Sequence, residues 1–250
     1  MLPFMLRAAG AKYTPPSTPS GGSIPIVPAL WYKNSDIPAG GFGSWANSGT
    51  LGTGYTMSPF SSTPSVGTVG PYKSVDFSST NSLRFNNGVN ITLHQSSQAT
   101  PFCVFAVARV NSGGYCGFVT ADQMSPSYPD GIGPQNHPTH YEWYDNDGGP
   151  FTATFTSATN SQLTQYIYYH QSDNSVQWYE SKTASATLST TGSYGANLSM
   201  QGIGWISGYQ PSGTSVCELL VYTNNLTPSQ MQSIRNYLGQ QYPATGRVNA

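Results

Sequence analysis

From Ala29 onward, the chain consists of short stretches in which apolar and polar residues alternate, separated by turn residues. Clear examples are YKSVDF at 72–77, SLRF at 82–85 and SVQWYE at 175–180. A period of two residues is the pattern of a strand with one buried face. FCVFAVARV at 102–110 is apolar on both faces, as expected of a central strand. About a dozen such stretches in succession predict an antiparallel sandwich or barrel.

The composition excludes several other classes of protein. With 27 glycines and 19 prolines, a coiled coil or helical bundle is excluded, and 37% hydrophobic residues argue against disorder. Charged residues make up 8% of the chain, the net charge is −1, and the basic residues form no patch, so we expect no nucleic-acid partner. An apolar run of the ~20 residues that cross a bilayer is also missing, so we expect no membrane partner.

One helix is expected near the end of the chain, in LTPSQMQSIRNYLGQQYP. Thr227 is a suitable N-cap, Pro228 suits the first helical position, and Gln230 completes a capping box. Gly239 offers a stop signal. The sequence therefore predicts a helix over 228–238.

The chain has three cysteines, an odd number that argues against a disulfide framework. NSGG at 111–114, between Cys103 and Cys116, reads as a hairpin turn that would keep these two thiols apart. We expect both, together with Cys217, to be buried reduced thiols.

Residues 1–28 differ from the rest because proline, serine and glycine dominate them. They predict an extended arm, followed by one domain over 29–243 and a short tail over 244–250. The arm has an apolar tip suited to docking on another protein; a frayed terminus is the alternative. The tip residues are Leu2, Phe4, Met5 and Leu6. The first residues lack the basic region of a secretory signal, so secretion is the less favoured reading.

Three segments carry a resemblance to a known family. SVCELLVYTNNLTPSQMQSIRNYLGQQY (215–242) is similar to the closing strand and helix of the concanavalin A-like lectin/glucanase superfamily in its laminin-G-like form. PALWYKNSDI (28–37) resembles the opening strand, and TPFCVFAVARV (100–110) resembles a central strand. The resemblance implies a two-sheet antiparallel jelly roll with one short C-terminal helix. It implies little about activity, because this fold hosts lectins, hydrolases and structural domains.

The glucanases of that superfamily share a strand motif of closely spaced carboxylates, and this chain lacks it. Its three glutamates, Glu142, Glu180 and Glu218, are isolated from one another. Glu142 and Asp145 come nearest to a pair, but on a strand they would point to opposite faces. Because glycoside hydrolysis requires two placed carboxyl groups, we expect the chain not to be an enzyme, and a glycoside hydrolase is the least favoured alternative.

Residues 124–150 are expected to form a long loop with clustered aromatic side chains. Sugars stack on aromatic faces and bond to amides, so this composition suits a glycan-binding surface. The alternative, slightly favoured because long loops need such anchors, is that the aromatic residues fix the loop to the core or to a neighbouring subunit. The candidate glycan-binding residues are Tyr128, Tyr141, Trp143, Tyr144 and Asn146.

DNDGG at 145–149 offers oxygen ligands for Ca²⁺ from Asp145 and Asp147, although a plain turn is favoured over a calcium site. No other cofactor is expected. His137 and His140 are expected to be solvated loop histidines rather than metal ligands.

Domains similar to this family occur on tailed phage particles. Together with the arm, this predicts a non-enzymatic virion structural protein: a capsid decoration, head fibre or tail adhesin on the virion surface. Its expected partners are the major capsid protein or tail proteins, further copies of itself, and cell-surface glycans. The alternative is a free or secreted carbohydrate-binding lectin.

Overall fold

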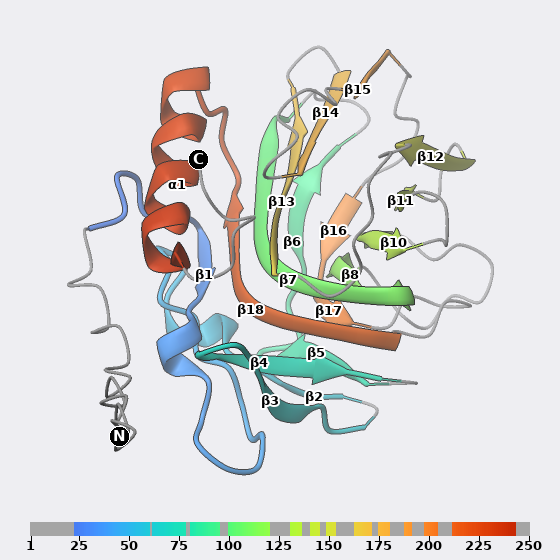
Figure 1. The fold of residues 1–250 in the computed structure, drawn as a ribbon. Helices are drawn as coiled ribbons and strands as arrows, with labels where there is room; N and C mark the ends of the chain where they lie inside the picture. Colours follow the sequence, from blue (N-terminus) through green and yellow to red (C-terminus); the bar gives the residue numbers. More distant parts are fainter. Residues whose placement is uncertain are drawn as a thin grey trace, which may run out of the picture.

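A computed structural model describes residues 23–60, 62–78, 81–95, 100–120, 131–136, 141–145, 149–153, 163–171, 175–180, 188–191, 198–204 and 212–243. These residues build two packed antiparallel sheets with one helix outside them (Figure 1).

The larger sheet is built around β7 (Phe102–Tyr115), which pairs with β13 (Thr164–His170) on one side and β18 (Ser212–Tyr222) on the other. In Figure 1 the long strands β7 and β18 bend together. The other strands of this sheet are β1 (Leu30–Tyr32), β3 (Ser65–Val69), β4 (Tyr72–Phe77), β10 (Pro134–Asn136), β11 (Tyr141–Asp145), β12 (Gly149–Ala153), β14 (Ser175–Glu180) and β15 (Leu188–Thr191).

The second sheet has five strands in the order β2, β5, β17, β8, β9. Their bounds are β2 (Met57–Pro59), β5 (Ser82–Phe85), β17 (Gly202–Gly204), β8 (Gly117–Thr120) and β9 (Gly131–Ile132). A separate pair consists of β6 (Ile91–His94) and β16 (Leu198–Met200), and two 3-10 turns are η1 (Asn34–Asp36) and η2 (Thr53–Tyr55).

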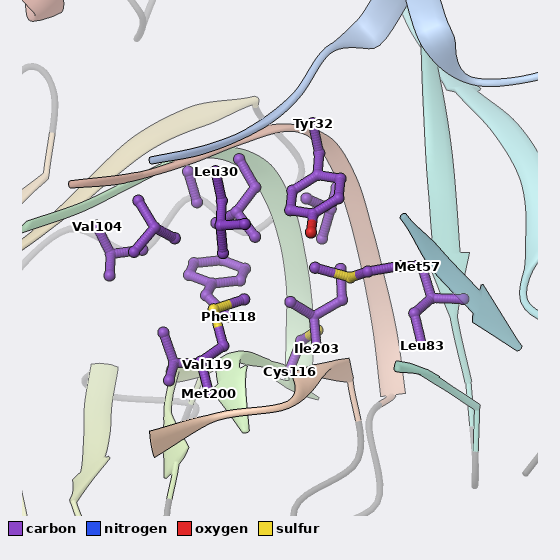
Figure 2. Packing of buried hydrophobic residues seen from close by; sticks show 14 of the residues in the cluster. Leu30, Tyr32, Met57, Leu83, Val104, Cys116, Phe118, Val119, Met200 and Ile203 are labelled. Carbon is purple, nitrogen blue, oxygen red and sulfur yellow. The ribbon is translucent and has the colours of Figure 1, made fainter. Parts of the chain in front are cut away.

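The main core fills the space between the two sheets. Strand alternation sends Phe102, Val104 and Ala106 of β7 into it, and Phe118 and Ile203 enter it from the second sheet. Figure 2 shows Val104 of the larger sheet and Phe118 and Ile203 of the second sheet among the side chains that fill this space. Burial of this apolar surface is the main contribution to the stability of the sandwich.

The opposite face of the larger sheet is covered by α1 (Pro228–Gln241), which forms a second apolar cluster with it (Figure 1). Cys103, Phe105 and Val107 of β7 contribute to this cluster, together with Ile234 and Leu238 of the helix. Sheet, core, sheet and helix therefore follow one another as layers.

The helix begins as predicted. The Thr227 hydroxyl accepts a hydrogen bond from Gln230 N at 3.2 Å, and Gln230 Oε1 accepts one from Thr227 N at 2.8 Å. It does not stop at Gly239, however, and continues to Gln241. Glycine inside a helix costs about 1 kcal/mol, and the extra turn places Tyr242 in a buried hydrogen bond described below. In the part of the chain described, no helix is long and apolar enough to span a membrane.

The predicted hairpin turn at 111–114 is wrong. β7 continues through NSGG, and β18 pairs with it on both sides of these residues, with Thr214 opposite Val110 and Ser212 opposite Tyr115. The register shifts between Ser212 and Thr214, so residues 111–114 form an irregularity within β7 and not a turn between two strands. The chain then crosses between the sheets at Cys116, which lies between β7 and β8. All three cysteines are buried free thiols, as predicted.

The prediction of a two-sheet antiparallel sandwich with one C-terminal helix is confirmed. Residues 1–22 of the predicted arm, including Leu2, Phe4, Met5 and Leu6, lie outside the described residues, as does the tail over 244–250. Ile24 and Ile26 pack against the cluster beneath α1, and the Tyr222 hydroxyl donates to Ile26 O at 2.9 Å.

Candidate functional site

The predicted glycan-binding residues fall partly on β11. Tyr141, Trp143 and Tyr144 lie on this strand, and Trp143 is opposite Phe151 of β12. β11 also lies beside β9, at one edge of the five-stranded sheet. Tyr128 and Asn146 lie outside the described residues.

Of the two predicted calcium ligands, one lies within the described residues and the other does not. Asp145 ends β11, opposite Gly149, whereas Asp147 lies outside the described residues. The calcium site and the loop histidines His137 and His140, also outside them, stay predictions.

A different group of side chains lies on the outer face of the five-stranded sheet. Leu83 and Phe85 of β5 are buried in the main core, so Arg84 between them faces away from the core. Across the sheet, Arg84 is opposite Ser58 of β2 and Gly202 of β17.

Arg84 stacks on an exposed aromatic ring. Its guanidinium carbon lies 3.4 Å from the ring centroid of Phe60, which follows β2 and is 43% exposed. A cation over an aromatic face gains about 0.5–1 kcal/mol at an exposed site. The stack therefore restrains the guanidinium while leaving aromatic surface in contact with solvent.

Beside this stack lies a shallow hollow of about 80 Å³, partly open to solvent. Gln201, between β16 and β17, lines it together with Arg84 and Val89. Gln201 is fixed by its backbone, because its N–H donates to Thr120 O at 2.8 Å and its carbonyl accepts from Phe85 N at 2.9 Å. Its side-chain oxygen Oε1 is buried without a hydrogen-bond partner among the described residues.

The rim of the hollow is a tight turn after β5. Gly88 has φ of +65°, a left-handed conformation that glycine adopts without strain. The Asn87 side chain accepts a hydrogen bond from Val89 N at 3.0 Å, and Val89 is 51% exposed. The turn therefore places an apolar side chain next to Arg84 and Gln201.

This arrangement has the parts of a polar-ligand site. Phe60 and Val89 offer apolar contact, and Arg84 and Gln201 add polar side chains beside them. None of these residues is among the site residues predicted from the sequence. Alternation in SLRF shows that Arg84 faces outward, but no sequence pattern brings Phe60 and Gln201 to it.

Glu218 is a buried carboxyl that accepts hydrogen bonds beneath α1. A bulge in β18 between Val216 and Glu218 turns its side chain toward α1. Its Oε1 accepts from Trp31 Nε1 at 2.7 Å and its Oε2 accepts from the Tyr242 hydroxyl at 2.5 Å. Burial raises the pKa of Glu218, and these two hydrogen bonds and Lys33 oppose the rise.

Two buried histidines form a further cluster. The rings of His94 and His170 are 4.4 Å apart, and Phe102 stacks on His170 at 5.3 Å. Burial lowers the pKa of His94, which favours the neutral ring. The part of the chain described contains no group of three or more side chains able to hold a metal ion.

Comparison with known proteins gives structural similarity alone. No protein-family model matches the chain, and no curated protein sequence matches it. The receptor-binding domain of botulinum neurotoxin C/D mosaic serotype has a TM-score of 0.56 at 11% identity, over 86% of this chain and 51% of that one. A Trypanosoma rangeli sialidase in complex with sialic acid has a TM-score of 0.56 at 10% identity, over 92% of this chain.

A third similar structure is matched over nearly its whole length. Domain 4 of AbnA, a GH43 extracellular arabinanase from Geobacillus stearothermophilus, in complex with arabinotriose, has a TM-score of 0.54 at 14% identity. The match covers 83% of this chain and 98% of that domain. By contrast, the chain spans only 35% of the sialidase. At these identities the similarities show a shared β-sandwich fold.

The prediction that this chain is not an enzyme is contradicted by these comparisons. The similar structures include sialidases and a domain of an arabinanase, which are glycoside hydrolases, so chains with this fold occur in enzymes. The chain lacks the closely spaced carboxylates of the glucanases, but absence of that one motif does not exclude other catalytic arrangements. What these comparisons establish about this chain itself is a lectin-like β-sandwich fold.

Proposed function

We propose that this chain is a carbohydrate-binding β-sandwich domain that holds its ligand at the hollow formed by Arg84, Val89 and Gln201, beside Phe60. The observation that carries the proposal is the Arg84–Phe60 stack next to a buried, unsatisfied amide oxygen of Gln201. Sugar rings present apolar faces that pack on aromatic rings, and their hydroxyl groups donate to amide oxygens.

The similar structures support a carbohydrate ligand. The arabinanase domain was solved with arabinotriose and the sialidase with sialic acid. Because the arabinanase domain is matched over 98% of its length, a unit of this size and fold occurs with a bound oligosaccharide.

We expect Phe60→Ala to weaken glycan binding about tenfold or more, because an aromatic stacking contact contributes about 1–3 kcal/mol. The measurement is a glycan array with the full chain, followed by titration of the best ligand. Leu51→Ala is the matched control, since Leu51 is 40% exposed and lies outside the hollow. Trp143→Ala tests the surface predicted from the sequence on β11. Loss of binding in Trp143→Ala alone would move the site to β11, and no binding by the wild type would refute the proposed function.

The role on a virion is a second proposal, supported by the sequence of the arm. Ile24 and Ile26 pack beneath α1, so the described part of the chain begins on the outer side of the larger sheet. In this proposal the apolar residues of the arm dock on a capsid or tail protein, while the sandwich is displayed on the surface.

We expect deletion of residues 1–22 to abolish incorporation into particles while the sandwich stays folded. The deletion stops before Ile24 because that residue belongs to the apolar cluster beneath the helix. Co-sedimentation with particles measures incorporation, and circular dichroism checks the fold. A truncated chain that still incorporates would refute docking by the arm.

A further inference from the structure

The sequence contains one Asn-Gly pair, Asn87–Gly88, and the structure places it in the exposed turn that follows β5. Residues 86–90 are all exposed to solvent. A Cβ atom at Gly88 would meet nothing within 4 Å, so the space around this residue is open. The turn therefore combines an uncrowded peptide nitrogen with free access for water.

An asparagine side chain can react with the peptide bond that follows it. The Gly88 nitrogen loses its proton to solvent and attacks Cγ of Asn87, and the new N–Cγ bond closes a five-membered succinimide ring. The bond from Cγ to Nδ2 breaks, and Nδ2 takes a proton from water and leaves as ammonia. One water molecule then adds to either ring carbonyl and opens the ring to aspartate or isoaspartate. Glycine favours the ring closure because no side chain crowds its nitrogen or restricts its backbone.

The hydrogen bonds of the turn suit this reaction. Val89 N donates to Asn87 Oδ1 at 3.0 Å, which holds the side chain beside the following backbone and polarises its carbonyl group. The leaving group, Asn87 Nδ2, makes no hydrogen bond with the described residues. The Gly88 N–H donates to Phe85 O at 3.2 Å, at the long end of the range for such bonds. Water can replace that bond because the turn is exposed.

Asn47 is a protected asparagine with a similar hydrogen bond. Its Oδ1 also accepts from the backbone N–H two residues further on, that of Gly49, at 2.9 Å. Its Nδ2, however, donates to Gly52 O at 2.9 Å, and the residue is only 4% exposed. The residue that follows it is Ser48, which has a side chain. Asn47 therefore keeps its amide for reasons that do not apply at Asn87.

We propose that Asn87–Gly88 is a site of spontaneous deamidation in the folded chain, with water as the co-reactant. Both products add a negative charge to the turn. Isoaspartate also adds a methylene group to the backbone just before Gly88 and Val89, which line the hollow. The proposal does not depend on what the hollow binds, because the reaction needs only the turn and water.

The test is peptide mapping of the full chain by mass spectrometry after incubation in a mildly alkaline buffer, which favours loss of the proton from the Gly88 nitrogen. We expect progressive loss of the Asn87 amide, seen as two acidic peptides of equal mass that separate by chromatography, while Asn47 in the same sample stays intact. Asn87→Gln is the matched control, because its longer side chain would have to close a less favoured six-membered ring. It should keep its amide. Asn87→Asp forms one of the two products directly and identifies its peptide.

A parallel incubation in urea separates the effect of the fold from that of the dipeptide. We expect the folded chain to lose the Asn87 amide within a few-fold of the rate in the unfolded chain, since the exposed turn leaves the reacting groups accessible. An Asn87 that stays intact in the folded chain, with or without conversion in urea, would overturn the proposal. Equal loss of the amide at Asn87 and Asn47 in the folded chain would overturn the roles assigned to Gly88 and to exposure.

Discussion

Glu218→Ala is expected to lower the free energy of unfolding by about 2–5 kcal/mol, because it leaves Trp31 Nε1 and the Tyr242 hydroxyl without their acceptor and opens a cavity beneath α1. A buried donor without a partner costs about 1–3 kcal/mol. Tyr242 is almost fully buried, so water does not replace the lost acceptor there. Urea unfolding followed by the fluorescence of Trp31 and the other tryptophans measures the change.

The control for this substitution is Glu218→Gln, which keeps the shape and one acceptor oxygen and is expected to lose less stability. If Glu218→Ala were as stable as the wild type, the hydrogen bonds to Trp31 and Tyr242 would make no net contribution, and the helix would be held by apolar packing alone.

The same carboxyl predicts a pH dependence. Because burial raises the pKa of Glu218 above its ordinary value of 4.5, the folded chain keeps this proton to higher pH than the unfolded chain does. This contribution to stability is therefore complete below pH 4.5 and is lost as the pH rises through the folded pKa. Relative to Glu218→Gln, the wild type should become less stable as the pH rises from 4 toward neutral. A flat difference between the two profiles would show that burial does not perturb Glu218.

Gly202→Ala is expected to destabilise the five-stranded sheet by about 2–3 kcal/mol and to abolish binding at the hollow. A Cβ atom at Gly202 would lie 1.8 Å from Leu83 O, so β5 and β17 would have to move apart. Gly202 is opposite Arg84 and next to Gln201, and this movement would separate the two polar side chains of the site.

Thermal unfolding and the glycan array measure the two effects of Gly202→Ala. Gly41→Ala is the control, because a Cβ atom there meets nothing within 4 Å. Its effect should stay within about 0.5 kcal/mol, as for ordinary surface substitutions. A Gly202→Ala chain with wild-type stability would mean that the sheet can absorb the added methyl group.

The candidate site shows what sequence patterns can and cannot locate. Alternation in SLRF places Leu83 and Phe85 inward and Arg84 outward, since strand periodicity is local. The stacking of Arg84 on Phe60 and its proximity to Gln201 depend on the pairing of β5 with β2 and β17. The aromatic residues of 124–150 were predicted to bind glycans because they are clustered in the sequence. The residues of the hollow are not clustered in the sequence.

The sequence by itself determined the features that depend on neighbours along the chain: the strands outside 111–150, the capping box at Thr227 and the buried thiols. The predicted long loop over 124–150 is wrong, because β9, β10, β11 and the start of β12 lie in it. The sequence also determined the fold class, because many short amphipathic strands can bury their apolar faces only against a second layer. Only the tertiary structure decided the rest. Strand β7 continues through NSGG because β18 pairs with it on both sides of these residues, and α1 passes Gly239 because Tyr242 reaches Glu218. Both outcomes depend on contacts between residues far apart in the chain, whose energies no local pattern encodes.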